Sequence, residues 1–250
     1  MKETIIVDHL WKKFRRFSKF RPRTLKDMLI QGFRELKPTE TFWALRDVSF
    51  SVGPGEMVGI IGKNGAGKST LLRLVGGVGL PNEGKITVEK PVRGLLELGA
   101  GFSPDLNGRE NAYVAGVIDG LTRRQVSERM DSIIDFAELG AYIDQPLRTY
   151  STGMRLRLAF AVAVHTEPRV LLIDEVLAVG DAAFRTKCID RISRFRDDGC
   201  TILFVSHDEE QVRQFCDRLL WLHHGEVITY GPTQEVLNTY LTQMNQNDAL

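Results

Sequence analysis

The fold is decided by Gly62-Lys63-Asn64-Gly65-Ala66-Gly67-Lys68-Ser69. This glycine-rich stretch follows the apolar run 56–61, which is typical of a buried strand, and leads into the run 69–75, which has helical character. In that context the pattern G-x-x-x-x-G-K-[S/T] predicts a loop that wraps phosphate groups. Glycines permit a tight turn with inward-pointing N–H groups, and the N-terminus of the next helix adds partial positive charge.

The loop also supplies two reactive side chains. We expect Lys68 to reach the β- and γ-phosphates of a nucleotide and Ser69 to bind Mg²⁺. A glycine turn without chemistry is disfavoured, because the Lys-Ser pair stands between a strand and a helix. The predicted nucleotide-binding residues are Gly62, Asn64, Gly65, Ala66, Gly67, Lys68, Ser69 and Thr70.

Further along the chain, strand and helix patterns alternate. The runs 170–173 and 201–205 are apolar and rich in β-branched residues, and each follows a helical segment, 154–165 and 182–196 respectively. This order predicts an α/β fold with a parallel sheet covered on both faces. Helical patterns at 108–119 and 122–139 predict a helical lobe, about 104–165. The alternation expected of antiparallel strands occurs at 4–7, 44–52, 85–88, 219–222 and 226–229, the last two joined across His224-Gly225.

Composition excludes several classes of protein. With 250 residues, 43% hydrophobic and 26% charged, the chain has the profile of a globular protein, and its length fits a single domain, 1–250. No run approaches the roughly 18 apolar residues of a membrane span, and the N-terminus lacks a secretory pattern, so we expect it to face the cytoplasm. The spacing of Cys188, Cys200 and Cys216 predicts reduced structural thiols and no metal-thiolate site.

An acidic pair ends the apolar run 170–173. Asp174 and Glu175 would lie at the carboxyl edge of the sheet, where ligands of such folds bind. Asp174 would hold Mg²⁺ through water, and Glu175 would orient and polarise the attacking water as a general base. Taken alone, an acidic pair after a strand more often only opens a loop. Its place after the phosphate loop favours the catalytic interpretation.

The turn Tyr150-Ser151-Thr152-Gly153-Met154 opens another helix, with Ser151 as a plausible N-cap. It resembles the LSGGQ signature of ABC transporter ATPases. The resemblance covers nearly the whole chain in family order: 62–69 as Walker A, 170–175 as Walker B with its glutamate, 178–181 as the D-loop and 206–208 as the switch histidine. It implies a P-loop NTPase of the ABC ATPase cassette type, with a parallel-sheet core, an antiparallel β-subdomain and a helical lobe.

The same resemblance implies a head-to-tail homodimer that binds ATP between Walker A of one subunit and the signature of the other. Ser151 and Gly153 would then offer donors and a helix dipole to the γ-phosphate. His207 would contact the γ-phosphate or the water, although a lone histidine after a strand is more often structural. Asp181 belongs to the implied nucleotide site.

By position, Phe14 is the aromatic residue that would stack on adenine, with Trp11 and Phe17 as competitors. The alternative for Phe14 is a ring packed under the β-subdomain. The sequence itself does not choose between these aromatic residues, because stacking needs only a flat ring.

A narrower resemblance rests on the strings 96–102, 107–111, 150–154 and 175–181. They look like the ATPase subunits of exporters that move O-antigen, capsule or teichoic acid chains on lipid carriers. This resemblance implies a subunit that binds an integral-membrane permease at the cytoplasmic face of the inner membrane, with a coupling surface around 97–106 and the helical lobe.

 The expected partners are therefore two permease subunits embedded in the membrane, and the expected cargo is a lipid-linked polysaccharide.

Two features depart from the family pattern. The signature reads STGM where the family has SGGQ, and no glutamine stands in the expected Q-loop between Arg93 and Asn111. Glu97 is the only acid beside that turn, which makes it the candidate replacement as a Mg²⁺ contact. A soluble ABC ATPase acting on DNA or ribosomes is disfavoured, because such proteins carry long coiled coils or two cassettes in one chain.

A basic stretch lies near the N-terminus. Residues 11–37 hold ten basic and two acidic side chains, a net +8, so the rest of a chain of net charge +1 carries −7. An insertion at about 15–41 contains the stripe Leu25, Met28, Leu29, Gly32, Phe33 and Leu36, which predicts an amphipathic helix ending before Pro38. The helix could pack on the cassette, or contact the membrane partner, anionic headgroups or a lipid pyrophosphate. We favour a contact with the membrane partner, the headgroups or the lipid pyrophosphate over packing on the cassette. Binding to nucleic acid is disfavoured because the rest of the chain is acidic.

Overall fold

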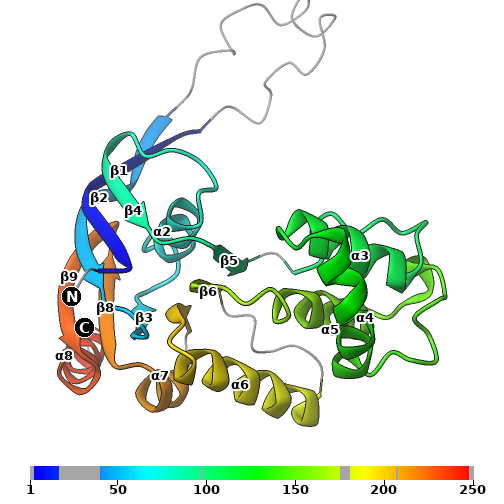
Figure 1. Cartoon of the computed structure of the whole chain (residues 1–250). Helices are drawn as coiled ribbons and strands as arrows, with labels where there is room; N and C mark the ends of the chain where they lie inside the picture. Colours follow the sequence, from blue (N-terminus) through cyan, green and yellow to red (C-terminus); the bar gives the residue numbers. More distant parts are fainter. Residues whose placement is uncertain (1–2, 17–39, 97, 175–180, 207, 248–250) are drawn as a thin grey trace, which may run out of the picture.

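The computed structural model describes residues 3–16, 40–96, 98–174, 181–206 and 208–247, and these form two sheets with helices around them (Figure 1). The larger sheet has six strands, in the order β5-β6-β7-β3-β8-β9. Its strands are β5 (Val92–Leu95), β6 (Val170–Asp174), β7 (Thr201–Val205), β3 (Met57–Ile61), β8 (Arg218–His223) and β9 (Glu226–Pro232). The first five are parallel to one another, and β9 pairs antiparallel to β8.

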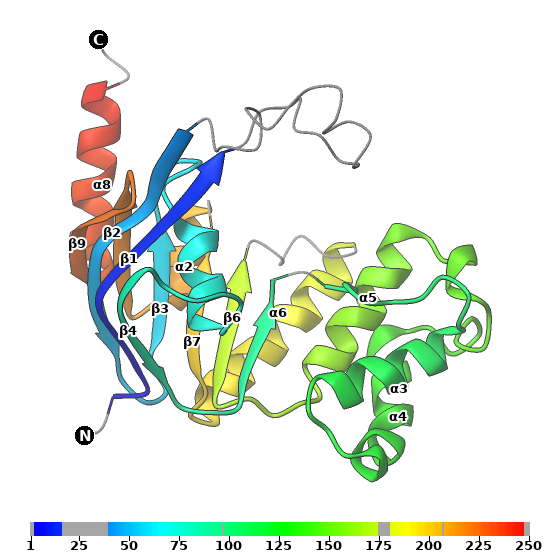
Figure 2. The ribbon, with the colours of Figure 1, turned by 90° about the horizontal axis from the view of Figure 1, so that it is seen from above.

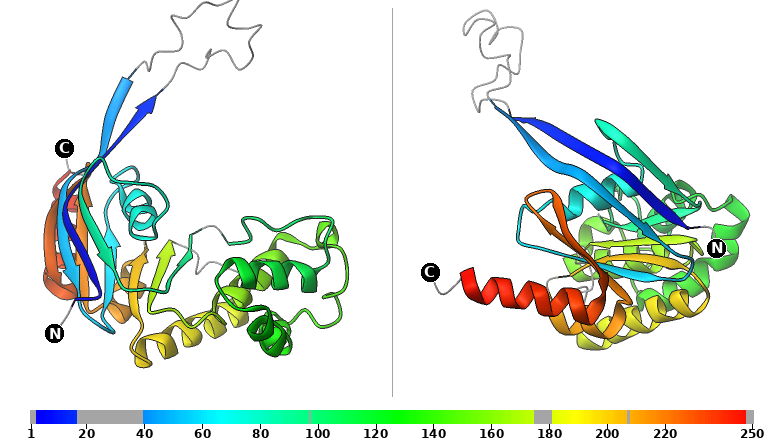
Figure 3. Two further views of the ribbon diagram at one scale, coloured as in Figure 1. Left: turned by 45° about the horizontal axis from the view of Figure 1, so that its top comes forward. Right: turned by 90° about the vertical axis from the view of Figure 1, so that its left-hand side faces the viewer.

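The smaller sheet is antiparallel, in the order β2-β1-β4. It consists of β1 (Ile5–Arg16), β2 (Glu40–Val52) and β4 (Glu83–Val88). The far ends of β1 and β2 project as a two-stranded arm, well away from the six-stranded sheet (Figures 1 and 3). We call residues 11–16 and 40–43 the arm.

Strict alternation along the central strands places their side chains on two faces. In β3, Met57 and Ile61 face one core cluster, while Val58 and Ile60 face another. The first cluster also contains residues of four helices, α5 (Thr152–Ala163), α6 (Ala182–Asp197), α7 (Glu209–Phe215) and α8 (Thr233–Asn247). The second is closed by α2 (Lys68–Val75) and the smaller sheet. The parallel sheet is therefore covered on both faces, as predicted.

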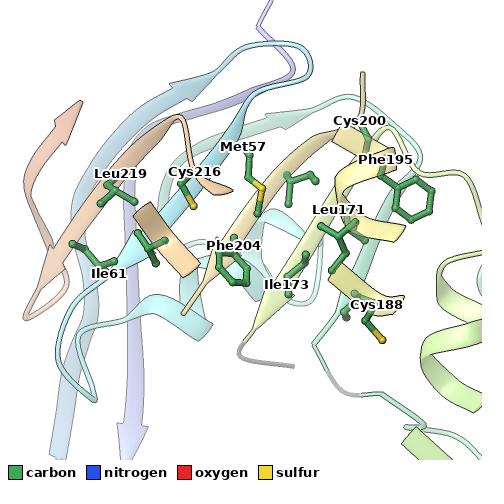
Figure 4. Close-up of a cluster of buried hydrophobic side chains, with 14 of the residues drawn as sticks. Met57, Ile61, Leu171, Ile173, Cys188, Phe195, Cys200, Phe204, Cys216 and Leu219 are labelled. Carbon is green, nitrogen blue, oxygen red and sulfur yellow. The ribbon is translucent and has the colours of Figure 1, made fainter. Parts of the chain in front are cut away.

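The three cysteines lie in the first cluster, where Figure 4 shows Cys188, Cys200 and Cys216 among apolar side chains. All three are free thiols, and burial raises the pKa of each to about 12. At neutral pH they are protonated and pack as small apolar groups.

A helical lobe stands beside the sheet (Figure 2). It contains α3 (Gly108–Ile118), α4 (Arg123–Ala137), the 3-10 turn η2 (Leu147–Thr149) and α5. Capping boxes begin both α3, with Asn107 and Glu110, and α4, with Thr122 and Gln125. Helix α5 belongs to both parts of the molecule, because Phe160 packs into the sheet core and Leu158 into the lobe.

The sequence predicted most of these elements, with some differences. Strand β8 is parallel to β3, because it adds to the edge of the main sheet and only its hairpin partner β9 runs antiparallel. Strand β5 and helices α7 and α8 were not predicted. Strands β1 and β2 reach Arg16 and Glu40, so that part of the expected insertion is a β-hairpin. The amphipathic helix expected at 25–36 lies outside the described residues. None of the described helices combines the length and the apolar character needed to cross a membrane.

Candidate nucleotide site

The phosphate loop, Asp174 and Ser206 lie at the carboxyl ends of three adjacent parallel strands, β3, β6 and β7. The phosphate loop follows β3 directly, Asp174 ends β6, and Asp174 pairs in register with Val205 at the end of β7. Ser206, the residue after Val205, is buried, and its Oγ accepts a hydrogen bond from the Asp208 N–H at 3.0 Å. These ends lie at one edge because the strands are parallel, which is where ligands bind in such sheets. Glu97, Glu175 and His207 lie outside the described residues.

Three glycines of the phosphate loop have positive φ angles: Gly62 (145°), Gly65 (83°) and Gly67 (108°). A side chain on Gly62 would collide with the Leu222 carbonyl oxygen. At Gly67 an added Cβ would lie 2.6 Å from the Ala44 oxygen, whereas at Gly65 it would meet nothing within 4 Å. The loop therefore needs glycine at two positions, because its backbone packs directly on β8 and β2.

The β8–β9 turn supports the same loop. The N–H of Gly225 donates to the Ala66 oxygen at 3.0 Å, and the Gly225 oxygen accepts from the Arg46 N–H at 2.8 Å. Sequence reasoning saw only a hairpin turn at His224-Gly225 and missed this role. The only signal in the sequence was the glycine turn at His224-Gly225, and nothing in its residues links this turn to the phosphate loop.

Lys68 is 6% exposed, and its ammonium lies across the loop. Its Nζ donates to the Gly62 oxygen at 2.7 Å and to the Lys63 oxygen at 3.2 Å. Those carbonyls hold the positive charge at the loop without neutralising it. Ser69 is exposed and Thr70 is half-buried in the first turn of α2. Both are therefore accessible to a nucleotide or metal ion bound at the loop.

The N-terminus of α2 is suited to an anion. Among the described residues, no side chain caps it at Gly67, and its first turn contains no acid. By contrast, the side chains of Asn107, Thr122, Ser151, Asp181 and Asp208 cap α3, α4, α5, α6 and α7. An uncapped terminus leaves donor N–H groups and a positive dipole end for a phosphate. The chain thus fits the phosphates of ATP, and the hydroxyl of Ser69 and carboxylate of Asp174 are ligand types that Mg²⁺ prefers.

The predicted signature turn also begins a helix. The Ser151 Oγ accepts a hydrogen bond from the Met154 N–H at 3.2 Å, and the first turn of α5 contains no acid. Ser151 and Thr152 are exposed. Within one chain this turn lies apart from α2 in both main views (Figures 1 and 2).

Asp181 is held by its own chain. One carboxylate oxygen accepts from the Phe184 N–H at 2.9 Å and the other from Arg157 Nη2 at 2.5 Å. These contacts, the Phe184 N–H foremost, hold the pKa of Asp181 below its usual value. Arg157 also donates to Glu138 at 2.9 Å, so it joins α5, α6 and the end of α4. The nucleotide contact expected of Asp181 stays a prediction.

The candidate adenine residues lie on the arm. Phe14 is 42% exposed, and the centroid of its ring lies 6.0 Å from that of Phe42. Trp11 and Trp43 meet edge to face at 5.3 Å. The exposure of Phe14 favours a ring available for stacking over one packed beneath the sheet. Phe17 lies outside the described residues.

Similarity to known proteins agrees with this geometry. A protein-family model described as ABC transporter matches residues 45–178, which include the phosphate loop, Ser151 and Asp174. The chain belongs to the ABC transporter family. Among its relatives in this family, the O-antigen export system ATP-binding protein RfbB of Klebsiella pneumoniae is 47% identical over 88% of this chain and 90% of its own.

Other ABC transporter relatives are longer than this chain. The teichoic acids export ATP-binding protein TagH of Bacillus anthracis is 41% identical over 96% of this chain and 43% of its own length. Among solved structures, one titled as the ATP binding subunit of an ABC transporter gives a TM-score of 0.75 at 22% identity, covering 95% of this chain and 93% of its own. A dimeric ATP-binding cassette bound to ADP and Pi gives 0.72 at 21%, covering 92% and 98%. These likenesses confirm the ABC ATPase fold.

Proposed function

We propose that this chain is the ATP-hydrolysing subunit of an ABC exporter that moves a lipid-linked, O-antigen-like polysaccharide across the cytoplasmic membrane. The phosphate loop is the observation that carries the proposal. Its glycines, the Lys68 ammonium and the uncapped N-terminus of α2 together suit the phosphates of a nucleoside triphosphate. The O-antigen-like cargo is supported by relatives such as RfbB, which are named as O-antigen export proteins. The alternative cargo is teichoic acid, capsule or another lipid. Teichoic acid is supported by the TagH relatives, which match nearly the whole chain.

In this proposal two copies of the single 1–250 domain bind ATP between them. The exposed Ser151 turn supports this arrangement, because it offers a second helix N-terminus that its own phosphate loop does not use. Gly153 would let the turn approach the γ-phosphate closely. Closing the dimer on ATP and opening it after hydrolysis would drive the exporter.

For the hydrolysis, Lys68 would stabilise negative charge on the phosphates, and Ser69 and Asp174 would hold Mg²⁺ with Glu97 as the further candidate ligand. When bound, Mg²⁺ would neutralise charge on the β- and γ-phosphate oxygens. Glu175 would take the proton of the attacking water, and His207 would contact the γ-phosphate or that water. Phe14 would stack on adenine, and Asp181 remains a candidate of the nucleotide site.

The permease partners would dock beside the helical lobe at the cytoplasmic face of the inner membrane. A cavity of about 90 Å³ there is lined by residues 98–102 together with Ala115, Ile118 and Ala159. Ile118 is 73% exposed, and Val114 and Val117 are exposed on the same helix. Apolar side chains exposed together commonly mark an interface.

The arm supports a contact with an anionic surface, either a membrane or the pyrophosphate of the lipid-linked substrate. Lys13, Arg15 and Arg16 are exposed on its projecting end (Figure 3). Near an anionic leaflet each such charge contributes about 1 kcal/mol. Replacing Arg15 and Arg16 by Glu should leave ATP binding intact and reduce export, and unchanged export would remove this part of the proposal.

The main experiment is to purify the subunit alone and together with its permease partner, and to measure the ATPase activity of both preparations. Co-purification and stimulated turnover are expected, and a subunit that never binds a membrane protein would contradict the proposal. The variant Glu175→Gln should bind ATP and accumulate the closed dimer, whereas rapid turnover would refute the base assignment. The glycan lost on deletion of the gene identifies the cargo.

A further inference from the structure

Over residues 5–16 and 40–52, all of them described, the two long strands of the smaller sheet slip out of register three times. Each slip places one extra residue on one strand, first on β1 and then twice on β2. A bulge of this kind bends its strand and increases the local twist. The three bulges therefore set the direction in which the arm leaves the sheet (Figures 1 and 3). The strand pairs that bound them are Val7–Phe50, Leu10–Val48, Lys12–Leu45 and Lys13–Trp43.

His9 and Asp47 lie at the first and second of these bulges. Both have positive φ angles, of 46° and 49°, which residues other than glycine seldom adopt. Nδ1 of His9 lies 2.6 Å from Oδ1 of Asp47, so a side-chain hydrogen bond joins the two strands across consecutive bulges. The His9 N–H also donates to Ser49 Oγ at 2.9 Å. We call the side-chain contact the His9–Asp47 pair.

Strand β4 fixes the backbone of His9 from the other side. β1 also shifts register against β4, between Asp8 and Trp11. Gly84 of β4 has a φ of 84°, and a side chain on it would collide with the His9 carbonyl oxygen. Because β4 packs on this carbonyl and Asp47 holds the ring, the first bulge is fixed by both neighbouring strands.

The third bulge lies beside the phosphate loop. It includes Ala44, whose oxygen would lie 2.6 Å from a Cβ on Gly67. Outward from Ala44, the arm pairs Phe42 with Phe14, the residue that we expect to stack on adenine. A change in the direction of the arm therefore moves the Phe14 ring relative to phosphates bound at the loop.

We propose that His9 is a positioning residue for the nucleotide base, because its contact with Asp47 sets the direction in which the arm presents Phe14. The inference rests on the proposed function, in which Phe14 stacks on adenine. Without the His9–Asp47 pair the ring would occupy more directions, and the apparent affinity for ATP falls with the fraction of them that allows stacking. The loss concerns binding of the base and leaves the chemical step alone.

Charge strengthens the pair. The hydrogen bond with Asp47 raises the pKa of His9 above its usual 6.5, and the charges of Asp47 and Asp8 raise it further. Lys85, opposite Asp8, and Glu83 are the charged residues that β4 places around the bulge. Because the folded pKa is raised, the ionic part of the pair is complete below the unfolded value and is lost as the pH rises through the folded value.

The test replaces His9 by Asn, which tolerates a positive φ and has no charge to pair with Asp47. In the subunit purified with its permease partner, we expect KM for ATP to rise about 3-fold, within the range for an exposed ion pair, with kcat unchanged. Calorimetry on the subunit should show the same loss of ATP affinity and no loss for inorganic triphosphate, which has no base. Unchanged ATP affinity, or an equal loss for both ligands, would overturn the proposal.

A matched control is Asp8→Asn. The Asp8 carboxylate lies 3.9 Å from Nε2 of His9, so the variant removes a neighbouring charge and keeps the contact with Asp47. At about pH 6, where His9 is charged in both proteins, it should bind ATP as the wild type does. A loss equal to that of His9→Asn would show that any charge near the bulge has this effect, and would contradict the specific role of the pair.

The variant Phe14→Ala separates failure of this inference from failure of the proposed function. We expect it to weaken ATP binding, and His9→Asn should have no further effect in its background, because the two residues act through one ring. If Phe14→Ala binds ATP as the wild type does, the adenine assignment fails, and the inference with it. If Phe14→Ala weakens binding and His9→Asn does not, only the positioning role is wrong.

A measurement on the wild type covers the case that His9→Asn does not fold. The ratio of the affinity for ATP to that for inorganic triphosphate cancels effects of pH on the phosphates and on the phosphate loop. This ratio should fall as the pH rises from about 6 to about 9, because His9 loses its charge over that range. A ratio that stays constant over that range would refute the proposal.

Discussion

Two helix N-termini of this molecule are available to an anion, and they are built differently. Helix α2 begins at Gly67, with no capping side chain among the described residues and a 6% exposed lysine in its first turn. Helix α5 begins at the exposed Ser151, whose own hydroxyl caps it. The first is a preformed cradle fixed by backbone contacts. The second is a surface that another molecule must meet, as the proposed dimer requires.

The largest expected effect breaks the cradle. Lys68→Ala removes the only ammonium that the described loop holds in contact with two of its own carbonyls, and ATPase activity should fall about 100-fold or more. Lys63→Ala is the control, because its exposed side chain belongs to the same loop and only its carbonyl is used. Turnover of Lys68→Ala within a few fold of the wild type would show that the cradle is not where the phosphates bind.

A second change separates backbone crowding from backbone strain. Gly67→Ala places a Cβ 2.6 Å from the Ala44 oxygen at a φ of 108°, whereas Gly65→Ala meets a similar φ of 83° with no neighbour within 4 Å. We expect Gly67→Ala to lose about 1–3 kcal/mol of unfolding free energy and about 10-fold in ATP affinity. Denaturant titration and calorimetry measure both. Equal effects of the two variants would mean that strain alone matters.

A third change tests the surface terminus. Aspartate caps a helix as well as serine does, so Ser151→Asp should keep stability, whereas Ser151→Ala should lose about 1 kcal/mol. The added charge of Ser151→Asp would repel the γ-phosphate of the other subunit, and turnover should fall about 10-fold with ATP binding by the single subunit unchanged. If that binding also weakens, the turn acts on its own chain and the comparison of the two termini fails.

Sequence patterns predicted the two termini unequally. The phosphate loop was found because its glycines and Lys68 must stand at fixed spacing after a strand, and the structure gives each a physical reason. The Ser151 turn was assigned through family resemblance, since a Ser/Thr/Gly turn by itself predicts only a cap. Backbone hydrogen bonds between distant parts of the chain were not predictable, because the side chains of the bonded residues carry no signal of them. Examples are the bonds from Gly225 to Ala66 of the phosphate loop and from Leu147 to Leu106. The same holds for the parallel pairing of β8 with β3, which depends on sheet order.

The smallest expected effect concerns Asp181, which caps α6 beside the Ser151 helix. Its pKa lies below the usual 3.8, because the Phe184 N–H and then Arg157 favour the charged form. A lowered folded pKa means that the contribution to stability is complete above the unfolded value and is lost as the pH falls through the folded value. Asparagine caps equally well and has no charge to titrate. The unfolding free energy of the wild type should therefore decline more steeply than that of Asp181→Asn below about pH 4, by a small amount since the carboxylate is exposed. Parallel pH profiles would mean that neither the Phe184 N–H nor Arg157 favours the charged form of Asp181 in solution.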